Sequence, residues 1–292
     1  MLDLRDLQFL SALVRHKHFA RAAADCGVSQ PAFSMRIRAL EEKLNTPIVR
    51  RGNRYQGLTP EGEAILRHAR PILDEMRAME QGILAAKGEI SGTLILGVIP
   101  TAAAYAARLA IQLRAKHPGI IPRIETASSI EIQQWIEDGT IDAGITYSDN
   151  VVSDLTTSTP LYNESYRLLA PTALVAQHDD TITWADAAKL PLSLLEPRMQ
   201  NRRILDAMFQ EIGAHPQVIA EASAVSICMS MACEGLAATV VPQVILDTFG
   251  PLIGTKALTL IEPSLTKSIC LISATREPGL PTVNALRQIT QD

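Results

Sequence analysis

The chain has 292 residues, of which 47% are hydrophobic, 20% charged and only 4% aromatic. This composition is typical of a folded globular protein and excludes wholesale disorder, collagen-like repeats and a disulfide-rich scaffold. No apolar run approaches the roughly 20 residues of a membrane-spanning helix, and the N-terminus carries acids where a signal peptide carries basic residues. We therefore expect a cytoplasmic protein with no membrane partner, whose four cysteines are buried thiols.

The net charge of −4 conceals an uneven distribution along the chain. Residues 1–60 carry a net charge of +5, and the remaining residues carry −9. A basic head on an acidic body predicts contact with nucleic acid at one end only. The length of the chain favours more than one domain.

Three short helices are predicted in the basic head. Apolar residues at helical spacing predict a helix over about 4–16, and an alanine-rich helix follows over about 19–26. Gly27 suits the tight turn after it. Ser29 is a good N-cap for the third helix, and Pro31 falls in its first turn. This arrangement is a helix-turn-helix, whose last helix enters the major groove of DNA.

The third helix directs an apolar stripe to the core and polar residues outward. We expect Gln30, Pro31 and Ser34 to meet base edges, and arginines of this helix and of the basic wing at 50–54 to meet phosphates. A short helical corner with a solvated, charged face is also common in proteins that never bind DNA. The predicted DNA-binding residues are Ser29, Gln30, Pro31, Ser34, Met35, Arg36, Arg38, Arg51 and Arg54.

The residues of the head resemble a known family. The segments 20–24, 28–34, 37–41 and 58–62, together with Arg51, match in order the winged helix-turn-helix of LysR-type transcriptional regulators. The match runs over about the first 65 residues, and the length and organisation of the rest also fit that family. Met35 stands where many members carry a polar or basic residue, so base recognition there is expected to differ. Val49 replaces a common aromatic residue, which is expected to change packing only.

A long helix after the head is predicted to pair with a second copy. Thr59 is a suitable N-cap and Pro60 suits the first helical position. Apolar residues then recur at heptad spacing, as in a two-helix coiled coil; packing of this stripe on its own protein is the alternative. The resemblance implies that this helix dimerises and that the protein is a homodimer or homotetramer. The predicted dimerisation residues are Ile65, Ala69, Ile72, Met76, Met79 and Ile83.

From residue 92 onward, strands and helices alternate. The order of strands over 93–99, 120–126 and 141–146 with helices between them predicts a parallel sheet covered on both faces. A second set of elements begins near residue 161, and a strand over 267–274 is expected to return to the first lobe. The predicted fold is therefore α/β, with an N-terminal winged helix-turn-helix (1–58), a linker helix (59–88) and a two-lobed effector domain (89–292). Lobe I covers about 92–161 and 267–292, lobe II about 162–266, and by the resemblance the pair is similar to a type 2 periplasmic binding protein.

A ligand site is expected between the two lobes, because small molecules bind at the strand ends of open α/β sheets. Hydroxyls and free N–H groups at helix starts favour an anion, so we expect a small, anionic metabolite as effector. Each serine or threonine is also explained by simple helix capping. The predicted effector-binding residues are Pro100, Thr101, Ser128, Ser129, Arg198, Gln200, Asn201, Ser223 and Val225.

The sequence therefore predicts a transcriptional regulator that binds double-stranded DNA at a near-palindromic operator, responds to a small molecule and contacts RNA polymerase. No phosphate loop, zinc-protease motif or nucleophile elbow is present, so we expect no enzyme, no cofactor and no metal. The competing classes are a ligand-binding protein without DNA function, a two-lobed enzyme, and a redox-sensing regulator that uses Cys228 or Cys233. Buried packing is the simpler explanation of both thiols.

Overall fold

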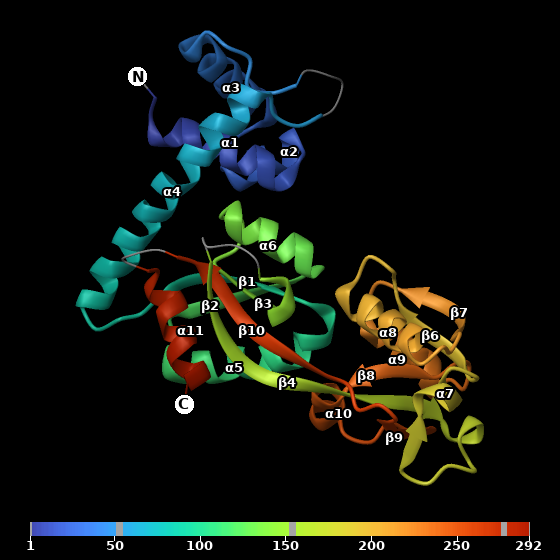
Figure 1. Cartoon of the computed structure of the whole chain (residues 1–292). Coiled ribbons are helices and arrows are strands. Elements are labelled where there is room, and N and C mark those ends of the chain that lie inside the picture. The colour runs from blue at the N-terminus through green and yellow to red at the C-terminus, as the bar shows by residue number, and fades with distance from the viewer. Residues whose placement is uncertain (1, 51–54, 152–155, 276–278, 292) are drawn as a thin grey trace. The chain divides into compact units, whose positions relative to one another are not determined.

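The computed structural model describes residues 2–50, 55–151, 156–275 and 279–291 (Figure 1). The chain forms two compact units, one composed mainly of residues 1–90 and the other mainly of the residues that follow. Among the described helices, none is both long and apolar enough to cross a bilayer.

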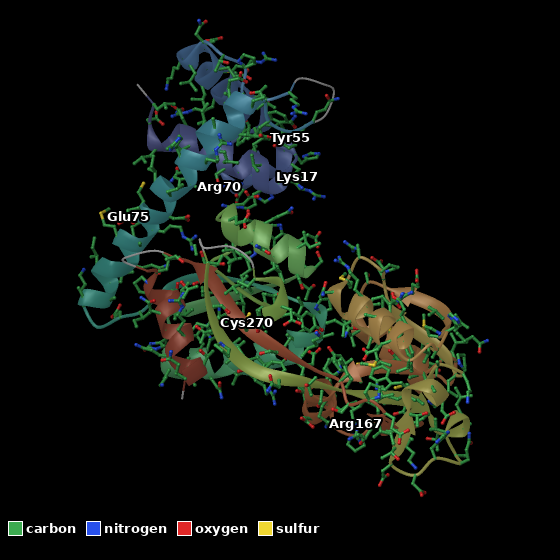
Figure 2. The ribbon with its side chains drawn as sticks, in the orientation of Figure 1. Lys17, Tyr55, Arg70, Glu75, Arg167 and Cys270 are labelled. Atoms are coloured by element: carbon green, nitrogen blue, oxygen red, sulfur yellow. The ribbon has the colours of Figure 1, made fainter. Side chains whose placement is uncertain are left out.

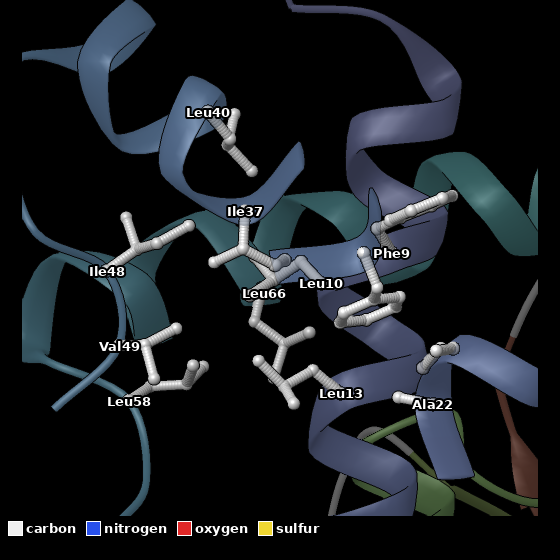
Figure 3. Packing of buried hydrophobic residues seen from close by; sticks show 13 residues of the cluster. Phe9, Leu10, Leu13, Ala22, Ile37, Leu40, Ile48, Val49, Leu58 and Leu66 are labelled. Atoms are coloured by element: carbon white, nitrogen blue, oxygen red, sulfur yellow. The ribbon is translucent and has the colours of Figure 1, made fainter. Parts of the chain in front are cut away.

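The first unit begins with three helices whose bounds lie close to those predicted: α1 (Leu4–His16), α2 (Phe19–Asp25) and α3 (Gln30–Leu44). Their core is built around Phe33, which is fully buried and stacks on the Phe9 ring at 4.9 Å between centroids. The Phe19 ring meets the Phe33 ring edge-on, with 6.2 Å between centroids. Leu10, Leu13 and other aliphatic side chains complete this core (Figure 3). Burial of these aromatic and aliphatic side chains holds the short helices together, since helices of this length are marginal alone.

The start of the wing is held to the three helices by a buried carboxylate. Glu41 of α3 is 8% exposed, and its Oε1 accepts hydrogen bonds from the backbone N–H groups of Ile48 (2.9 Å) and Val49 (3.2 Å). Val49 then pairs with Leu58 in an antiparallel bridge, which closes the base of the wing. Such charge-assisted bonds satisfy backbone donors that burial would otherwise leave unpaired.

The linker helix α4 (Pro60–Ala86) starts as predicted. The Thr59 hydroxyl accepts a hydrogen bond from the Gly62 N–H (3.1 Å) and donates one to the Pro47 carbonyl (2.7 Å), so the cap also ties the helix to the wing. Gly62 is needed because a Cβ there would lie 2.2 Å from the Ile48 carbonyl oxygen. The helix continues through Pro71 for 27 residues in all.

The second unit contains an eight-stranded mixed sheet with the main path β2-β1-β3-β10-β4-β9-β5. Strands β1, β2 and β3 are parallel, and β10 returns to pair antiparallel with β3, as the predicted strand at 267–274 requires. The main-path strands are β1 (Gly92–Val98), β2 (Ile120–Thr126), β3 (Ala143–Tyr147), β4 (Thr156–Pro171), β5 (Thr181–Thr183), β9 (Thr255–Ile261) and β10 (Thr266–Ala274).

Lobe II adds a small parallel sheet of β6 (Pro191–Leu195) and β7 (Gln217–Ala222), while β8 (Thr239–Pro242) pairs with β4. Helices pack around the two sheets, and β4 and β10 run side by side from one lobe to the other (Figure 1). The helices of this unit are α5 (Ala103–Lys116), α6 (Ser129–Glu137), α7 (Trp184–Ala187), α8 (Gln200–Glu211), α9 (Val225–Cys233), α10 (Gln243–Phe249) and α11 (Pro281–Gln291).

The two-lobed α/β architecture is confirmed, and so is the parallel pairing of the strands over 93–99, 120–126 and 141–146, which lie in a larger mixed sheet. Strand β4 is 16 residues long and antiparallel to β8, β9 and β10, and its first half could not be recognised in the sequence. Its first half is rich in threonine and largely accessible to solvent, so it lacks the apolar pattern that identifies a strand. Strand β9 and helix α10 were also missed.

Candidate DNA-binding surface and effector site

Helix α3 presents an accessible polar face, as expected for a recognition helix. Gln30, Pro31, Met35 and Arg38 are all exposed, and Met35 is the most notable of them at 67%. Ser34 is half-buried on the same side of the helix. Pro31, Met35 and Arg38 point away from the core stripe, and Gln30 is accessible at the first position of the helix, so these side chains can reach a surface that approaches α3.

Ser29 acts as the N-cap of α3, and its Oγ accepts a hydrogen bond from the Ala32 N–H at 3.4 Å. This bond fixes the start of the helix that carries the exposed residues. The role predicted for Ser29 therefore has a structural component, independent of any contact with DNA.

Arg36 is not free to meet a phosphate in this structure. Its Nε donates to Asp6 Oδ1 at 2.8 Å, and its Nη2 donates to both carboxylate oxygens of Asp3 at 2.7 and 2.8 Å. Lys43 Nζ donates to the other Asp6 oxygen at 2.8 Å. Burial acts to raise the pKa of Asp6, but the hydrogen bonds from Lys43, the Asp3 N–H and Arg36 prevail and lower it. This ion-pair cluster ties α3 to the start of α1, so Arg36 positions the recognition helix.

Two of the predicted phosphate contacts, Arg51 and Arg54, lie outside the described residues. The segment beside them is described: the Arg50 N–H donates to the Gly57 carbonyl at 3.0 Å, and the Arg50 side chain is exposed. A cationic side chain thus lies at the base of the wing, which is where the basic pattern placed it.

The heptad stripe of α4 divides into a buried and an exposed part. Ala69 is buried and Ile65 packs against the core of the three helices. Farther along, Ile72, Met79 and Ile83 are 45, 58 and 53% exposed in the single chain, and Met76 is half-buried. An apolar row on a long helix that its own chain leaves accessible is typical of a pairing surface.

Three predicted effector residues of lobe I meet at one edge of the sheet. The carboxyl ends of β1, β2 and β3 are adjacent, because β1 pairs parallel to both of the others. Thr101 follows β1 and is 1% exposed, while Ser128 and Ser129 follow β2 and are 7 and 4% exposed. The Thr101 hydroxyl lies 3.3 Å from the hydroxyl of Tyr147 at the end of β3. The convergence that the strand order predicted is therefore present.

The helix start at Ser128 is already occupied by a carboxylate of the chain. Glu131 Oε2 accepts hydrogen bonds from the Ser128 N–H (2.9 Å) and the Ser128 hydroxyl (2.7 Å). The Ser128 backbone donor is consequently satisfied. Ser129 Oγ, in contrast, is buried without a hydrogen-bond partner.

Lobe II faces this edge with two of its predicted residues. Arg198 Nη1 lies 3.9 Å from Glu131 Oε1, although the guanidinium is more closely paired with Glu196 at 2.5 Å. Asn201 is 5% exposed and lies beside the Tyr147 hydroxyl, and its Nδ2 has no hydrogen-bond partner.

The remaining predicted effector residues contribute less to this edge. Pro100 and Gln200 are half-buried at the starts of their helical segments, and Ser223 is exposed. Val225 packs in an apolar cluster that includes Ala104 of lobe I, so its side chain serves the core.

Glu164 is the residue of this region that sequence reasoning missed. It lies on the crossing strand β4, is 1% exposed, and accepts a hydrogen bond from the Tyr147 hydroxyl through Oε1 at 2.8 Å. Burial raises the pKa of its carboxyl to about 7, against the hydroxyls of Tyr166, Tyr147 and Thr101, which lower it. No signal in the polar stretch around it distinguishes this acid from a surface glutamate.

Two of the four cysteines are buried, rather than all four as the sequence predicts. Cys228 and Cys270 are 1 and 0% exposed, and burial is the main cause that raises the pKa of the Cys228 thiol. Cys270 lies on β10 within the main sheet (Figure 2). Cys26 and Cys233 are half-buried, and all four are free thiols. A raised pKa disfavours the thiolate that peroxide chemistry requires.

Comparison with known proteins agrees with this architecture. The model for the LysR substrate binding domain matches residues 87–292, and that for the bacterial regulatory helix-turn-helix protein of the lysR family matches residues 4–63. The chain belongs to the LysR family. It is thus a DNA-binding transcriptional regulator with a domain that responds to an effector molecule, and the family consists of regulators rather than enzymes.

Among relatives, this LysR-family regulator is 27% identical over 298 residues to the hydrogen peroxide-inducible genes activator of Haemophilus influenzae, covering 99% of this chain and 95% of that protein. It is 33% identical over 144 residues to the regulator CfxR of Cupriavidus necator, covering 49% of this chain and 45% of that one. Two solved structures share its fold. A full-length OxyR variant from Pseudomonas aeruginosa gives a TM-score of 0.76 at 23% identity, covering 100 and 97% of the two chains. Full-length CbnR complexed with its target DNA gives a TM-score of 0.69 at 19% sequence identity, covering 99% of each of the two chains.

Proposed function

We propose that the regulator reads its operator with the exposed face of α3. Gln30, Pro31 and Ser34 meet base edges, and Met35 adds an apolar contact of the kind that recognises a thymine methyl group. The observation that carries this proposal is the accessible face of α3, held in place by the core around Phe33 and by the ion pairs behind it.

Phosphate contacts come from the basic side chains around this face. Arg38 on α3 is exposed and available, and the wing arginines Arg51 and Arg54 keep the role that the sequence predicts. Arg36 holds α3 in position. We no longer count it among the phosphate contacts, because two carboxylates already bind its guanidinium.

The regulator works as a homodimer or homotetramer, paired through the exposed row Ile72, Met79 and Ile83 of α4. Pairing brings two recognition helices to the two half-sites of a near-palindromic operator. A further apolar surface supports a higher assembly: Ile121 lies on the sheet-edge strand β2 and is 59% exposed, and Ile111 of α5 is 71% exposed. Edge strands of this kind readily pair with another chain.

A small molecule bound at the junction of the lobes controls this assembly. Thr101, Ser129 and Asn201 are buried where the lobes meet, so a ligand there changes how the lobes close. Closure changes how dimers pack, and with it the bending of the operator and the contact with RNA polymerase. The proposed division is a DNA-binding domain over 1–58, a linker over 59–88 and an effector domain over 89–292, acting in the cytoplasm.

The DNA-binding half of this proposal is tested by the salt dependence of operator affinity. Sequences selected from a random duplex pool supply the operator, and fluorescence anisotropy measures its affinity between about 50 and 200 mM salt. Affinity should fall steeply, and Arg38→Ala should reduce the logarithmic slope by about one. Arg123→Ala, on an exposed strand of the effector domain, should leave the slope unchanged. An affinity that does not depend on salt would refute the proposal.

A further inference from the structure

A buried acid without a cationic partner lies at the junction of the lobes. Among the described residues, the groups that act on the Glu164 carboxyl are the hydroxyls of Tyr147, Tyr166 and Thr101, and none of them carries a positive charge. Lys267 is opposite Glu164 in the β4–β10 register, but its Nζ donates to Asp149 at 2.8 Å. Buried carboxylates are normally paired with a cation or remain protonated.

The polar atoms around this acid are incompletely satisfied. Glu164 Oε1 accepts from Tyr147, but Oε2 is buried with no hydrogen-bond partner. Asn201 Nδ2, from lobe II, is also buried with no hydrogen-bond partner. The same holds for the hydroxyl of Tyr162, which lies two residues before Glu164 on β4. Each such atom destabilises the fold while it stays unpaired. A fold that retains several of them in one place has a reason to do so, and a ligand is the simplest.

The chemistry of these atoms selects the ligand. In its ionised form Glu164 accepts hydrogen bonds through Oε2, whereas Asn201 Nδ2 donates one. An ammonium group supplies three donors together with the positive charge that the carboxylate lacks. A carboxylate ligand would instead meet the acid of Glu164 inside and that of Glu131 at the helix start, where Glu131 already binds the Ser128 N–H.

We propose that the effector carries an amino group and that its ammonium form pairs with the carboxylate of Glu164, which releases its proton to solvent as the ligand binds. This inference rests on the proposed effector site and differs from the anionic effector that the sequence predicts. Tyr147 and Thr101 lie beside the bound nitrogen, and Asn201 donates to an oxygen of the same ligand. Because these atoms are closed off from solvent, the lobes separate to admit the ligand and close again around it, which couples binding to the arrangement of the lobes.

Three matched probes of the full chain test this inference: propylammonium, propionamide and propionate, compared at constant ionic strength. Melting temperature is followed as a function of probe concentration, for the wild type, Glu164→Gln and the control Glu137→Gln. Glu137 is an exposed residue of α6 in the same domain. Propylammonium should raise the melting temperature along a saturable curve. Glu164→Gln should raise the half-saturating concentration about tenfold or more, and Glu137→Gln should leave it within about twofold.

Three outcomes would overturn the inference: saturation by propionate but not by propylammonium, equal responses to propylammonium and propionamide, or no saturable response to any probe. Operator binding measured on the same samples separates this failure from that of the proposed function. Intact, salt-dependent binding alongside any of these outcomes rejects the amine alone. If operator binding is lost together with the response to propylammonium, the proposed function as a DNA-binding regulator is rejected as well.

Discussion

Replacing Glu164 with glutamine should change how the stability of the effector domain depends on pH. The folded chain holds the pKa of this carboxyl at about 7, compared with an ordinary value of 4.5, chiefly because the group is buried. Between these two values the unfolded chain has released the proton and the folded chain, without ligand, has kept it. Rising pH therefore favours unfolding over this interval, and the penalty is complete above about pH 7.

The size of the effect follows from the shift. Each pKa unit corresponds to about 1.4 kcal/mol, so Glu164 lowers the free energy of unfolding by about 2–3 kcal/mol between pH 5 and pH 8. Glutamine does not titrate, and its carbonyl oxygen can still accept the hydrogen bond from Tyr147. As the pH rises from 5 to 8, we therefore expect the free energy of unfolding of Glu164→Gln to increase by about 2–3 kcal/mol relative to that of the wild type.

Neighbouring groups do not obscure this titration. The titratable and charged groups around Glu164 are Tyr147, Tyr162, Tyr166 and, across the strand pair, Lys267 with its partner Asp149. Burial raises the pKa of all three tyrosines above their ordinary value of 10, so they stay protonated throughout.

The assay is urea unfolding of the full chain at pH 5, 6, 7 and 8, with the effector-domain transition followed by circular dichroism. Glu137→Gln, an exposed change of the same kind, is the control and should track the wild type at every pH. Parallel stability curves for Glu164→Gln and the wild type would refute the reasoning, because they would show that the buried carboxyl is not protonated preferentially in the folded state.

Further predictions concern the DNA-binding unit. Asp6→Asn leaves two cations without their buried partner and should destabilise this unit by about 2–4 kcal/mol in urea unfolding; the exposed-pair control Asp25→Asn should cost under about 1 kcal/mol. Gly62→Ala places a Cβ against a backbone carbonyl and should lower the free energy of unfolding by about 2–4 kcal/mol. Gly82→Ala, which has open space around it, should raise the free energy of unfolding by about 0.5–1 kcal/mol in the same experiment. Met35→Ala should leave stability within about 0.5 kcal/mol but weaken selected operators by about 1 kcal/mol or more, unless thymine is replaced by uracil at the contacted position.

The head of the molecule could be predicted in detail because its signals are local. Capping by Ser29 and Thr59 and the apolar stripe of α3 are properties of a few neighbouring residues, and the structure has all of them. The binding of Arg36 to two aspartates could not be predicted, because those partners lie 30 and 33 residues away. A charged residue on a helix looks the same in sequence whether it faces DNA or another helix.

The effector site was predicted in outline only. Strand order alone places Thr101 and Ser128 at one edge, since parallel neighbours end together. Glu164 escaped notice because β4 crosses between the lobes as an antiparallel strand, and its first half shows no apolar alternation. The acid acquires its unusual environment only when Tyr147 and Thr101, from separate segments, bring their hydroxyls to it.

The central claim is that the exposed face of α3 reads a specific operator. Its most direct test is sequence selection from a random duplex pool with the full chain, carried out in parallel with a variant in which Gln30 and Ser34 are both alanine. The account predicts a near-palindromic sequence with two half-sites for the wild type and its loss for the variant, whose folding is verified by an unchanged melting temperature. Enrichment of the same sequence by both proteins, or no enrichment by the wild type, would contradict it.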